Sequence, residues 1–114
     1  MKIQQILELT HAVVVCGGDR LDKEISHAFA SDLMSDVLTL DMSDVILITG
    51  LCNSQTIRTA EMADIPCVLF VRGKKATPEI IALAEESDIV LLETNYSMYR
   101  AGGELHAQGL QAIY

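Results

Sequence analysis

Polar segments follow four short apolar runs of this sequence, at residues 17–20, 49–54, 72–75 and 94–95. They hold glycines, hydroxyls, an amide and several cations, which are the groups that bind small anions. Helices predicted to begin at Asn53 or Ser54 and at Thr77 would point backbone amide donors at the same space. The candidate anion-binding residues are Gly17, Gly18, Arg20, Thr49, Asn53, Ser54, Arg72, Lys74 and Thr94.

These segments can form one site only if the apolar runs before them are parallel strands. The carboxyl ends of parallel strands lie at one edge of a sheet, and ligands of α/β proteins usually bind there. In that arrangement we expect all four segments to meet. The alternative is that they are ordinary turn and helix-cap residues of an α/β domain.

Recognised catalytic and phosphate-binding motifs are missing from the sequence. It contains no GxxxxGK[ST], GxGxxG, HExxH or GxSxG pattern, and its histidines are scattered. Asp32 and Asp36 are spaced i, i+4 on a predicted helix, where two carboxylates hold a metal, shuttle a proton or simply face solvent. Cys52 would need a nearby base to act as a nucleophile. We expect no catalytic residue, no cofactor and no metal. One alternative hypothesis for function is an enzyme that uses Asp32, Asp36 or Cys52.

The cysteines Cys16, Cys52 and Cys67 are odd in number and far apart. They form no CxxC pair, which argues against a disulfide framework or a zinc site. Cys16 and Cys67 lie in predicted strands, where we expect them to be buried as small hydrophobic residues.

The clearest structural unit is a strand, a helix and a second strand within residues 65–94. A proline precedes the apolar run 67–71, which is too short for a helix and rich in strand formers. Thr77 and Pro78 then mark a helix start, with a hydroxyl at the N-cap and proline at the first helical position. After this helix comes the apolar run 89–92. A βαβ unit of this kind requires a parallel pair of strands.

The alternation of helices and strands extends through the rest of the chain. We expect strands at 12–16 and 45–49, and helices at 2–9, from a cap at Ser31 or Asp32 to residue 40, at 55–63 and at 97–107. Residues 25–30 are either a further strand or an extended segment. Because the strands are apolar on both faces, helices must cover both sides of the sheet. The expected fold is a three-layer α/β/α sandwich, one domain over residues 1–114, with a mostly parallel or mixed sheet of about five strands.

Composition narrows the class of protein. The chain has 114 residues, is 50% hydrophobic and carries a net charge of −8. That charge opposes nonspecific contact with phosphate backbones, and the cluster of Arg72, Lys74 and Lys75 has no interleaved aromatic residues that could stack on bases. No apolar run reaches the roughly 18 residues needed to span a bilayer, and the N-terminal residues lack a signal-peptide pattern. We therefore expect a cytoplasmic protein that binds neither nucleic acid nor membrane.

Several of these motifs, in this order, resemble the DRTGG domain family. They are GGDR at 17–20, the strand and glycine at 45–50, the βαβ unit at 66–92, and Glu93 and Thr94 with a last helix. The segment SDLMSDVL at 31–38 is similar to a subgroup of small stand-alone members. The resemblance covers nearly the whole chain. It implies a fold similar to the N-terminal domain of HPr kinase/phosphorylase, without the kinase lobe.

The same resemblance implies a regulatory or assembly role. Modules of this family accompany other domains and self-associate, and the stand-alone members accompany signalling proteins and iron-only hydrogenase components. A partner in signalling or redox regulation is therefore expected. The family's Thr-Gly-Gly signature is incomplete here, because residues 49–51 read Thr-Gly-Leu and residues 72–74 read Arg-Gly-Lys. The resemblance implies no catalytic residue.

Two further hypotheses for function follow. The first is a non-catalytic regulatory or assembly module that forms a homodimer and contacts a protein partner. The second is a sensor that binds a small anionic metabolite, such as a nucleotide or an acyl phosphate, at the carboxyl-edge loops.

Overall fold

A six-stranded sheet with the order β1-β5-β4-β3-β2-β6 forms the centre of the protein. The computed structural model describes residues 1–114, and its strands are β1 (Val13–Cys16), β2 (His27–Ala30), β3 (Val45–Thr49), β4 (Cys67–Phe70), β5 (Val90–Glu93) and β6 (Gln111–Ala112). Only β1 is antiparallel to its neighbour, which is β5. The mostly parallel, mixed sheet is confirmed. It has one strand more than expected, because the two-residue β6 pairs beside β2 at the edge.

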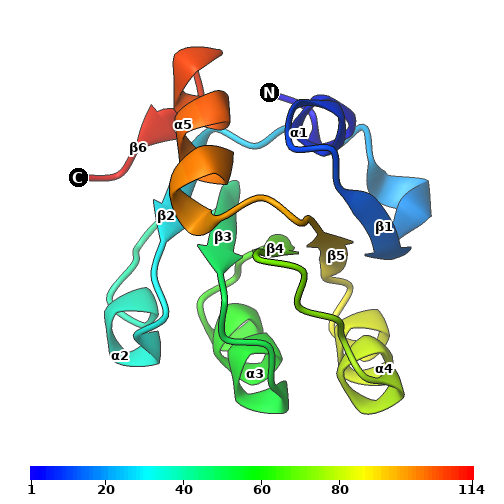
Figure 1. The fold of residues 1–114 in the computed structure, drawn as a ribbon. Helices are drawn as coiled ribbons and strands as arrows, with labels where there is room; N and C mark the ends of the chain where they lie inside the picture. Colours follow the sequence, from blue (N-terminus) through cyan, green and yellow to red (C-terminus); the bar gives the residue numbers. More distant parts are fainter.

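Helices cover both faces of the sheet (Figure 1). The helical elements are α1 (Ile3–Leu9), the 3-10 helix η1 (Gly18–Arg20), α2 (Met34–Val37), α3 (Ser54–Met62), α4 (Pro78–Glu86) and α5 (Met98–Ala107). α1 and α5 lie on one face, and α2, α3 and α4 lie on the other (Figure 1). This is the three-layer α/β/α sandwich that the sequence predicts. None of these helices has the length and apolar character needed to cross a membrane.

The core has two apolar layers, one on each side of the sheet. In β3, Ile46 and Ile48 pack in the layer of α1 and α5, while Leu47 packs in the layer of the other helices. In β4, Leu69 and Phe70 divide in the same way, because successive side chains of a strand point to opposite faces. Every residue of β3, β4 and β5 is buried, so the centre of the sheet is a rigid support for the loops at its ends.

Cys16 and Cys67 are both buried in these layers as predicted, one in each. The segment 25–30, for which the sequence left two readings open, contains β2, which pairs in parallel with β3. Its first residue, Ile25, lies outside the strand but is itself buried in the core.

The predicted helix starts after β3 and β4 are confirmed. Asn53 Oδ1 accepts a hydrogen bond from Thr56 N at 2.9 Å, and α3 begins at the residue after Asn53. Thr77 Oγ1 accepts a hydrogen bond from Ile80 N at 3.3 Å, and Pro78 is the first residue of α4. Both helix N-termini therefore follow the carboxyl ends of parallel strands.

The helix predicted from a cap at Ser31 or Asp32 to residue 40 is much shorter in the structure. α2 has four residues, and no side chain caps its N-terminus. Asp32 Oδ1 instead accepts hydrogen bonds from Thr49 Oγ1 and Gly50 N, both at 2.8 Å. Because Asp32 lies before the helix and is bonded to another loop, it does not share a helix face with Asp36. The predicted carboxylate pair is therefore wrong.

The reversed direction of β1 moves the turn that follows it to the other end of the sheet. Val13, the first residue of β1, pairs with Glu93, the last residue of β5. Gly17 follows β1 with a φ of +83°, and a Cβ there would lie 3.0 Å from Val90 Cα at the start of β5. Glycine is therefore required at this turn by backbone conformation and close packing.

We expect Gly17→Ala to lower the free energy of unfolding by more than about 1 kcal/mol, because the left-handed conformation and the contact with Val90 both strain alanine. Gly102→Ala is the matched control. Gly102 lies within α5, where a Cβ would meet nothing within 4 Å, and alanine there should stabilise the helix by up to about 1 kcal/mol. Urea unfolding followed by circular dichroism measures both changes. A Gly17→Ala protein as stable as the wild type would contradict this account of the turn.

Candidate functional site

A cavity of about 300 Å³ lies at the carboxyl edge of the sheet. It is lined by Asp32, Gly50, Val71, Arg72, Lys74 and Met98. These residues follow β2, β3 and β4 or begin α5, so the cavity is built by segments far apart in the sequence. β4 continues into α4 on one face of the sheet, whereas β5 continues into α5 on the other (Figure 1). α/β proteins bind ligands where adjacent connections diverge in this way.

The turn after β4 fixes the position of the two cations in the cavity. Arg72 and Gly73 both have a positive φ, of 58° and 71°. Arg72 N donates a hydrogen bond to Tyr96 O at 2.8 Å, and Gly73 N donates one to Thr94 O at 2.9 Å. The loop after β5 therefore holds the turn by its backbone, which leaves the side chains of Arg72 and Lys74 free to contact a ligand.

Neither Arg72 nor Lys74 has a carboxylate partner. Both side chains are exposed, and none of the ion pairs of the structure includes them. A guanidinium offers two parallel donors to a phosphate or carboxylate, and an ammonium adds a compact charge beside it. In a chain with a net charge of −8, this turn is a local site of positive charge that suits a small anion.

Asp32 joins two walls of the cavity. Its Oδ1 accepts the hydrogen bonds from Thr49 Oγ1 and Gly50 N, which ties the segment after β2 to the end of β3. Its Oδ2 has no hydrogen-bond partner, and it can accept a hydrogen bond from a ligand hydroxyl. A ligand with both a phosphate and a hydroxyl group matches this combination of two cations and a hydrogen-bond acceptor.

The predicted site residues Thr49 and Thr94 serve the loops instead of facing a ligand. Both are buried. Thr49 Oγ1 donates to Asp32 and accepts a hydrogen bond from Leu51 N at 3.1 Å. Thr94 Oγ1 donates to Thr10 O at 2.6 Å and accepts a hydrogen bond from Tyr96 N at 3.1 Å. Their hydroxyls are already engaged on both sides, so they shape the edge of the sheet.

Asn53 and Ser54 lie at the start of α3 and do not line the cavity. The side chain of Asn53 caps the helix through Thr56. Ser54 Oγ donates a hydrogen bond to Glu79 Oε1 at 3.4 Å, which links the first turns of α3 and α4. These two residues are part of the same edge but point their polar groups at helix ends.

The segment that contains Gly17, Gly18 and Arg20 lies away from the other predicted residues. The expectation that all four polar segments meet is therefore wrong for this segment. Arg20 Nη1 lies 3.5 Å from Asp88 Oδ1, and Asp88 precedes β5. The antiparallel direction of β1 is the reason, because its carboxyl end lies beside the amino ends of the parallel strands. Of the nine predicted residues, only Arg72 and Lys74 line the cavity.

Sequence reasoning missed Asp32 as a cavity residue, Met98 at the start of α5, and the buried Glu93. Glu93 ends β5, where it accepts a hydrogen bond from Ala76 N at 2.7 Å and lies 3.7 Å from Lys75 Nζ. A carboxylate directly after a fully apolar run was the available signal. No group of three or more histidine, cysteine, aspartate or glutamate side chains comes together to hold a metal ion.

Cys52 is a weak nucleophile in this environment. Partial burial raises the pKa of its thiol, the Glu93 carboxylate raises it further, and the Lys74 ammonium only partly opposes this. A raised pKa means less thiolate at neutral pH, and the thiolate is the reactive form. The raised pKa therefore gives no sign of an activated nucleophile at Cys52.

We expect iodoacetamide to alkylate Cys52 at pH 8 more slowly than it alkylates N-acetylcysteine, because the raised pKa of the thiol lowers its thiolate fraction. Glu93→Gln should increase the rate, since it removes a negative charge that raises this pKa. Peptide mass spectrometry measures the modified fraction over time, and Cys52→Ser identifies the modified residue. Alkylation as fast as that of N-acetylcysteine would contradict the assignment.

Comparison with known proteins supports the fold. No protein-family model matches the sequence, and no curated protein matches it. The structure is similar to the crystal structure of the CBS and DRTGG domains of the regulatory region of Clostridium perfringens pyrophosphatase, complexed with its activator, diadenosine tetraphosphate. The TM-score is 0.73 at 16% sequence identity, and the match covers 91% of this chain but 45% of that one. This likeness supports a DRTGG-like fold and gives no support to the resemblance to HPr kinase.

Proposed function

We propose that this chain is a non-catalytic regulatory module that binds a small anionic metabolite in the carboxyl-edge cavity. The observation that carries the proposal is the pair of cations without carboxylate partners, Arg72 and Lys74, on a turn held by backbone hydrogen bonds at the mouth of the cavity. Because the backbone of the turn is already ordered, binding has to order only the two side chains.

The start of α5 adds to the anion-binding character of the cavity. Met98 lines the cavity and is the first residue of α5, and Ser97 caps the helix by accepting a hydrogen bond from Arg100 N at 3.1 Å. The partial positive charge of a helix N-terminus favours an anion nearby. The same edge of the sheet holds the N-termini of α3 and α4.

Two further lines of evidence support this class of function. The pyrophosphatase region with a similar fold was solved with a nucleotide activator, diadenosine tetraphosphate. A ligand that carries phosphates fits the charge of Arg72 and Lys74. The separation of Asp32 from Asp36 and the raised pKa of the Cys52 thiol favour a regulatory role over an enzyme that uses these residues.

We expect a phosphate-bearing metabolite from a panel of nucleotides, acyl phosphates and phosphosugars to raise the Tm by several degrees. At a ligand concentration 100 times the Kd, binding contributes about 2.7 kcal/mol to the stability of the folded state. The double variant with Arg72→Gln and Lys74→Gln should lose this response. The double variant with Lys2→Gln and Arg58→Gln has the same net charge but keeps the cavity, so it should respond as the wild type does.

Thermal unfolding at low and moderate salt measures these responses. A ligand-induced shift that persists in the variant lacking Arg72 and Lys74 charges would place the binding site elsewhere. If both double variants lose the ligand-induced shift equally, binding depends on the net charge of the protein alone.

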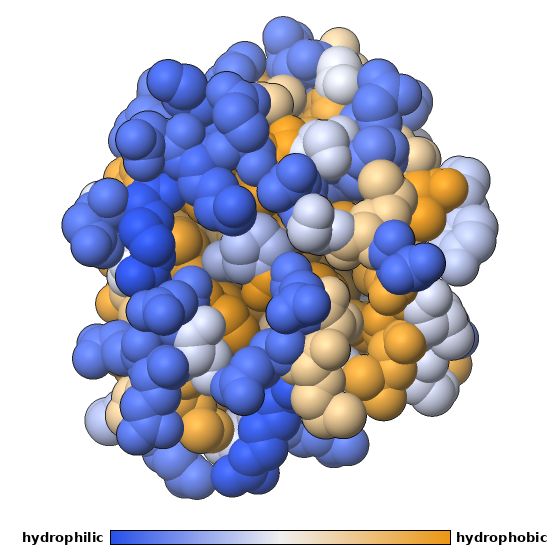
Figure 2. Space-filling model, turned by 180° about the vertical axis from the view of Figure 1, so that it is seen from behind, coloured by the Kyte–Doolittle hydropathy of each residue, from blue (hydrophilic) through white to orange (hydrophobic).

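A second candidate function is self-association. A hollow of about 280 Å³ lies between the ends of α2 and α3, and Leu38, Met42 and Met62 line it. All three are large hydrophobic side chains that remain exposed, Met62 by 73%. Such a cluster is typical of a surface that another protein covers. Figure 2 shows hydrophobic residues gathered on the side of the molecule that carries α2 and β2, while hydrophilic residues cover much of the rest.

We expect the protein to form a homodimer through this hollow, with a Tm that rises with protein concentration. Leu38→Ser combined with Met62→Ser should yield a monomer, whereas Leu33→Ser, at a similarly exposed leucine outside the hollow, should not. Because Asp41 and Asp64 border the hollow, association should strengthen at higher ionic strength. Sedimentation velocity measures the mass, and a wild-type monomer at all concentrations would rule out the homodimer.

A further inference from the structure

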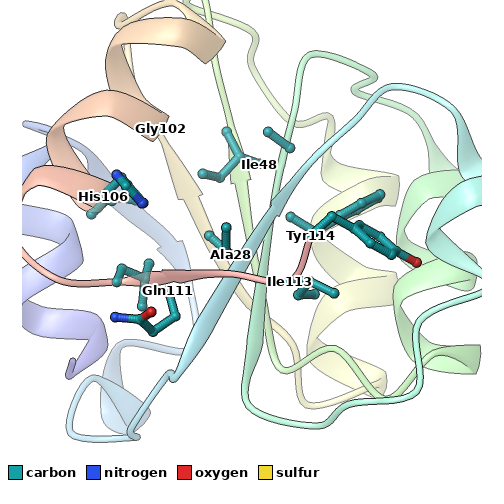
Figure 3. A pocket seen from close by; sticks show the side chains of 12 residues that line it. Ala28, Ile48, Gly102, His106, Gln111, Ile113 and Tyr114 are labelled. Atoms are coloured by element: carbon teal, nitrogen blue, oxygen red, sulfur yellow. The ribbon is translucent and has the colours of Figure 1, made fainter.

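A second cavity, of about 270 Å³, lies beneath α5 where the C-terminal segment pairs beside β2. Its walls are mainly apolar and include Ala28, Ile48 and Leu105. The phenol of Tyr114 is also in this lining, as are the polar side chains of His106 and Gln111. In Figure 3 these two lie on one side of the cavity, Tyr114 lies on the other, and Ala28 and Ile48 of the sheet lie between them.

The linings of this cavity and of the carboxyl-edge cavity are linked through a third, open hollow. An open hollow of about 540 Å³ shares Ala30, Gly102 and His106 with the apolar cavity, and it shares Met98 with the cavity of Arg72 and Lys74. The three spaces follow one another along α5, and together we call them the α5 groove. It is apolar at one end and cationic at the other. Met98 and His106 are eight residues apart, so the groove follows the helix for about 12 Å.

Two glycines keep the middle of the α5 groove open. Gly102 and Gly103 lie inside α5, where each costs about 1 kcal/mol of helix stability relative to alanine. A Cβ at either position would meet nothing within 4 Å, so packing within this chain does not require glycine there. Both residues line the open hollow. Without their side chains, a ligand can lie directly against the helix backbone.

We propose that the α5 groove binds a nucleoside polyphosphate, with the base in the apolar cavity and the phosphates at Arg72 and Lys74. This proposal rests on the anion site proposed above and names its ligand. The charge at the cationic end complements phosphates, and an apolar cavity beside aromatic Tyr114 suits a flat base. The 12 Å of helix between the two ends requires several phosphates in an extended chain.

The polar groups of the apolar cavity favour a base over an acyl chain. Gln111 Nε2 donates a hydrogen bond to Gly109 O at 3.1 Å, while the side-chain oxygen of Gln111 has no partner. The side chains of Gln111 and His106 are both exposed, and the imidazole of His106 has no hydrogen-bond partner within the protein. An exocyclic amino group of a base can donate to the Gln111 oxygen, and a ring nitrogen can pair with His106. An acyl chain would leave both groups unused.

Isothermal titration with two probes tests the proposal: ATP and inorganic tripolyphosphate. We expect ATP to bind at least about tenfold more tightly than tripolyphosphate, because the base adds stacking and apolar contacts. Gly102→Leu fills the groove between the two ends and should remove this advantage without weakening tripolyphosphate. Ala82→Leu introduces the same side chain at an exposed position of α4 outside the groove, and it should change neither affinity.

Each result separates the ligand from the anion site. Equal affinity for ATP and tripolyphosphate in the wild type would overturn the base subsite and leave the anion site standing. No binding of either phosphate probe would overturn both. A Gly102→Leu protein that keeps the full advantage of ATP would overturn the route through the groove. If that variant unfolds, Ala30→Leu, at an exposed residue shared by the apolar cavity and the hollow, provides the same test.

Discussion

Backbone hydrogen bonds between the loops after β4 and β5 organise the carboxyl edge of this protein. Arg72 and Gly73 adopt positive φ angles, which cost a non-glycine residue about 1–2 kcal/mol. The bonds from their amides to Tyr96 O and Thr94 O offset that cost and give the turn one conformation. Thr94 in turn donates to Thr10 O, which joins this edge to the end of α1. The backbone that carries the cations of the candidate site is thus fixed by contacts that no ligand has to provide.

The parts of the fold that the sequence predicted are those set by local chemistry. Thr77 and Pro78 specify the start of α4, and Asn53 specifies the start of α3, because a capping side chain bonds to amides only a few residues away. The buried strands β3, β4 and β5 are apolar on both faces, and this pattern requires helices on two sides. The cations after β4 were correctly placed for the same reason, since their strand was identified with its direction.

The parts that were missed depend on contacts distant in sequence. The apolar pattern of β1 does not indicate whether the strand is parallel or antiparallel to its neighbour. Only its pairing with β5 decides that Gly17 and Arg20 lie at the opposite end of the sheet. Asp32 resembled a helix cap, but the buried hydroxyl of Thr49 and the amide of Gly50 compete for its carboxylate. β6 has two residues and no periodicity, so its place beside β2 follows from the path of α5 across the sheet.

The two proposed surfaces lie on either side of one short element, and this geometry bears on regulation. α2 spans Met34–Val37, with Asp32 of the cavity just before it and Leu38 of the apolar hollow just after it. Met34 and Val37 are buried, so α2 cannot shift at one end without moving the other. If a ligand repositions Asp32 and a second copy covers Leu38, the two binding events share α2. Their coupling must then be reciprocal: a ligand that strengthens association is itself bound more tightly by the dimer, by the same factor.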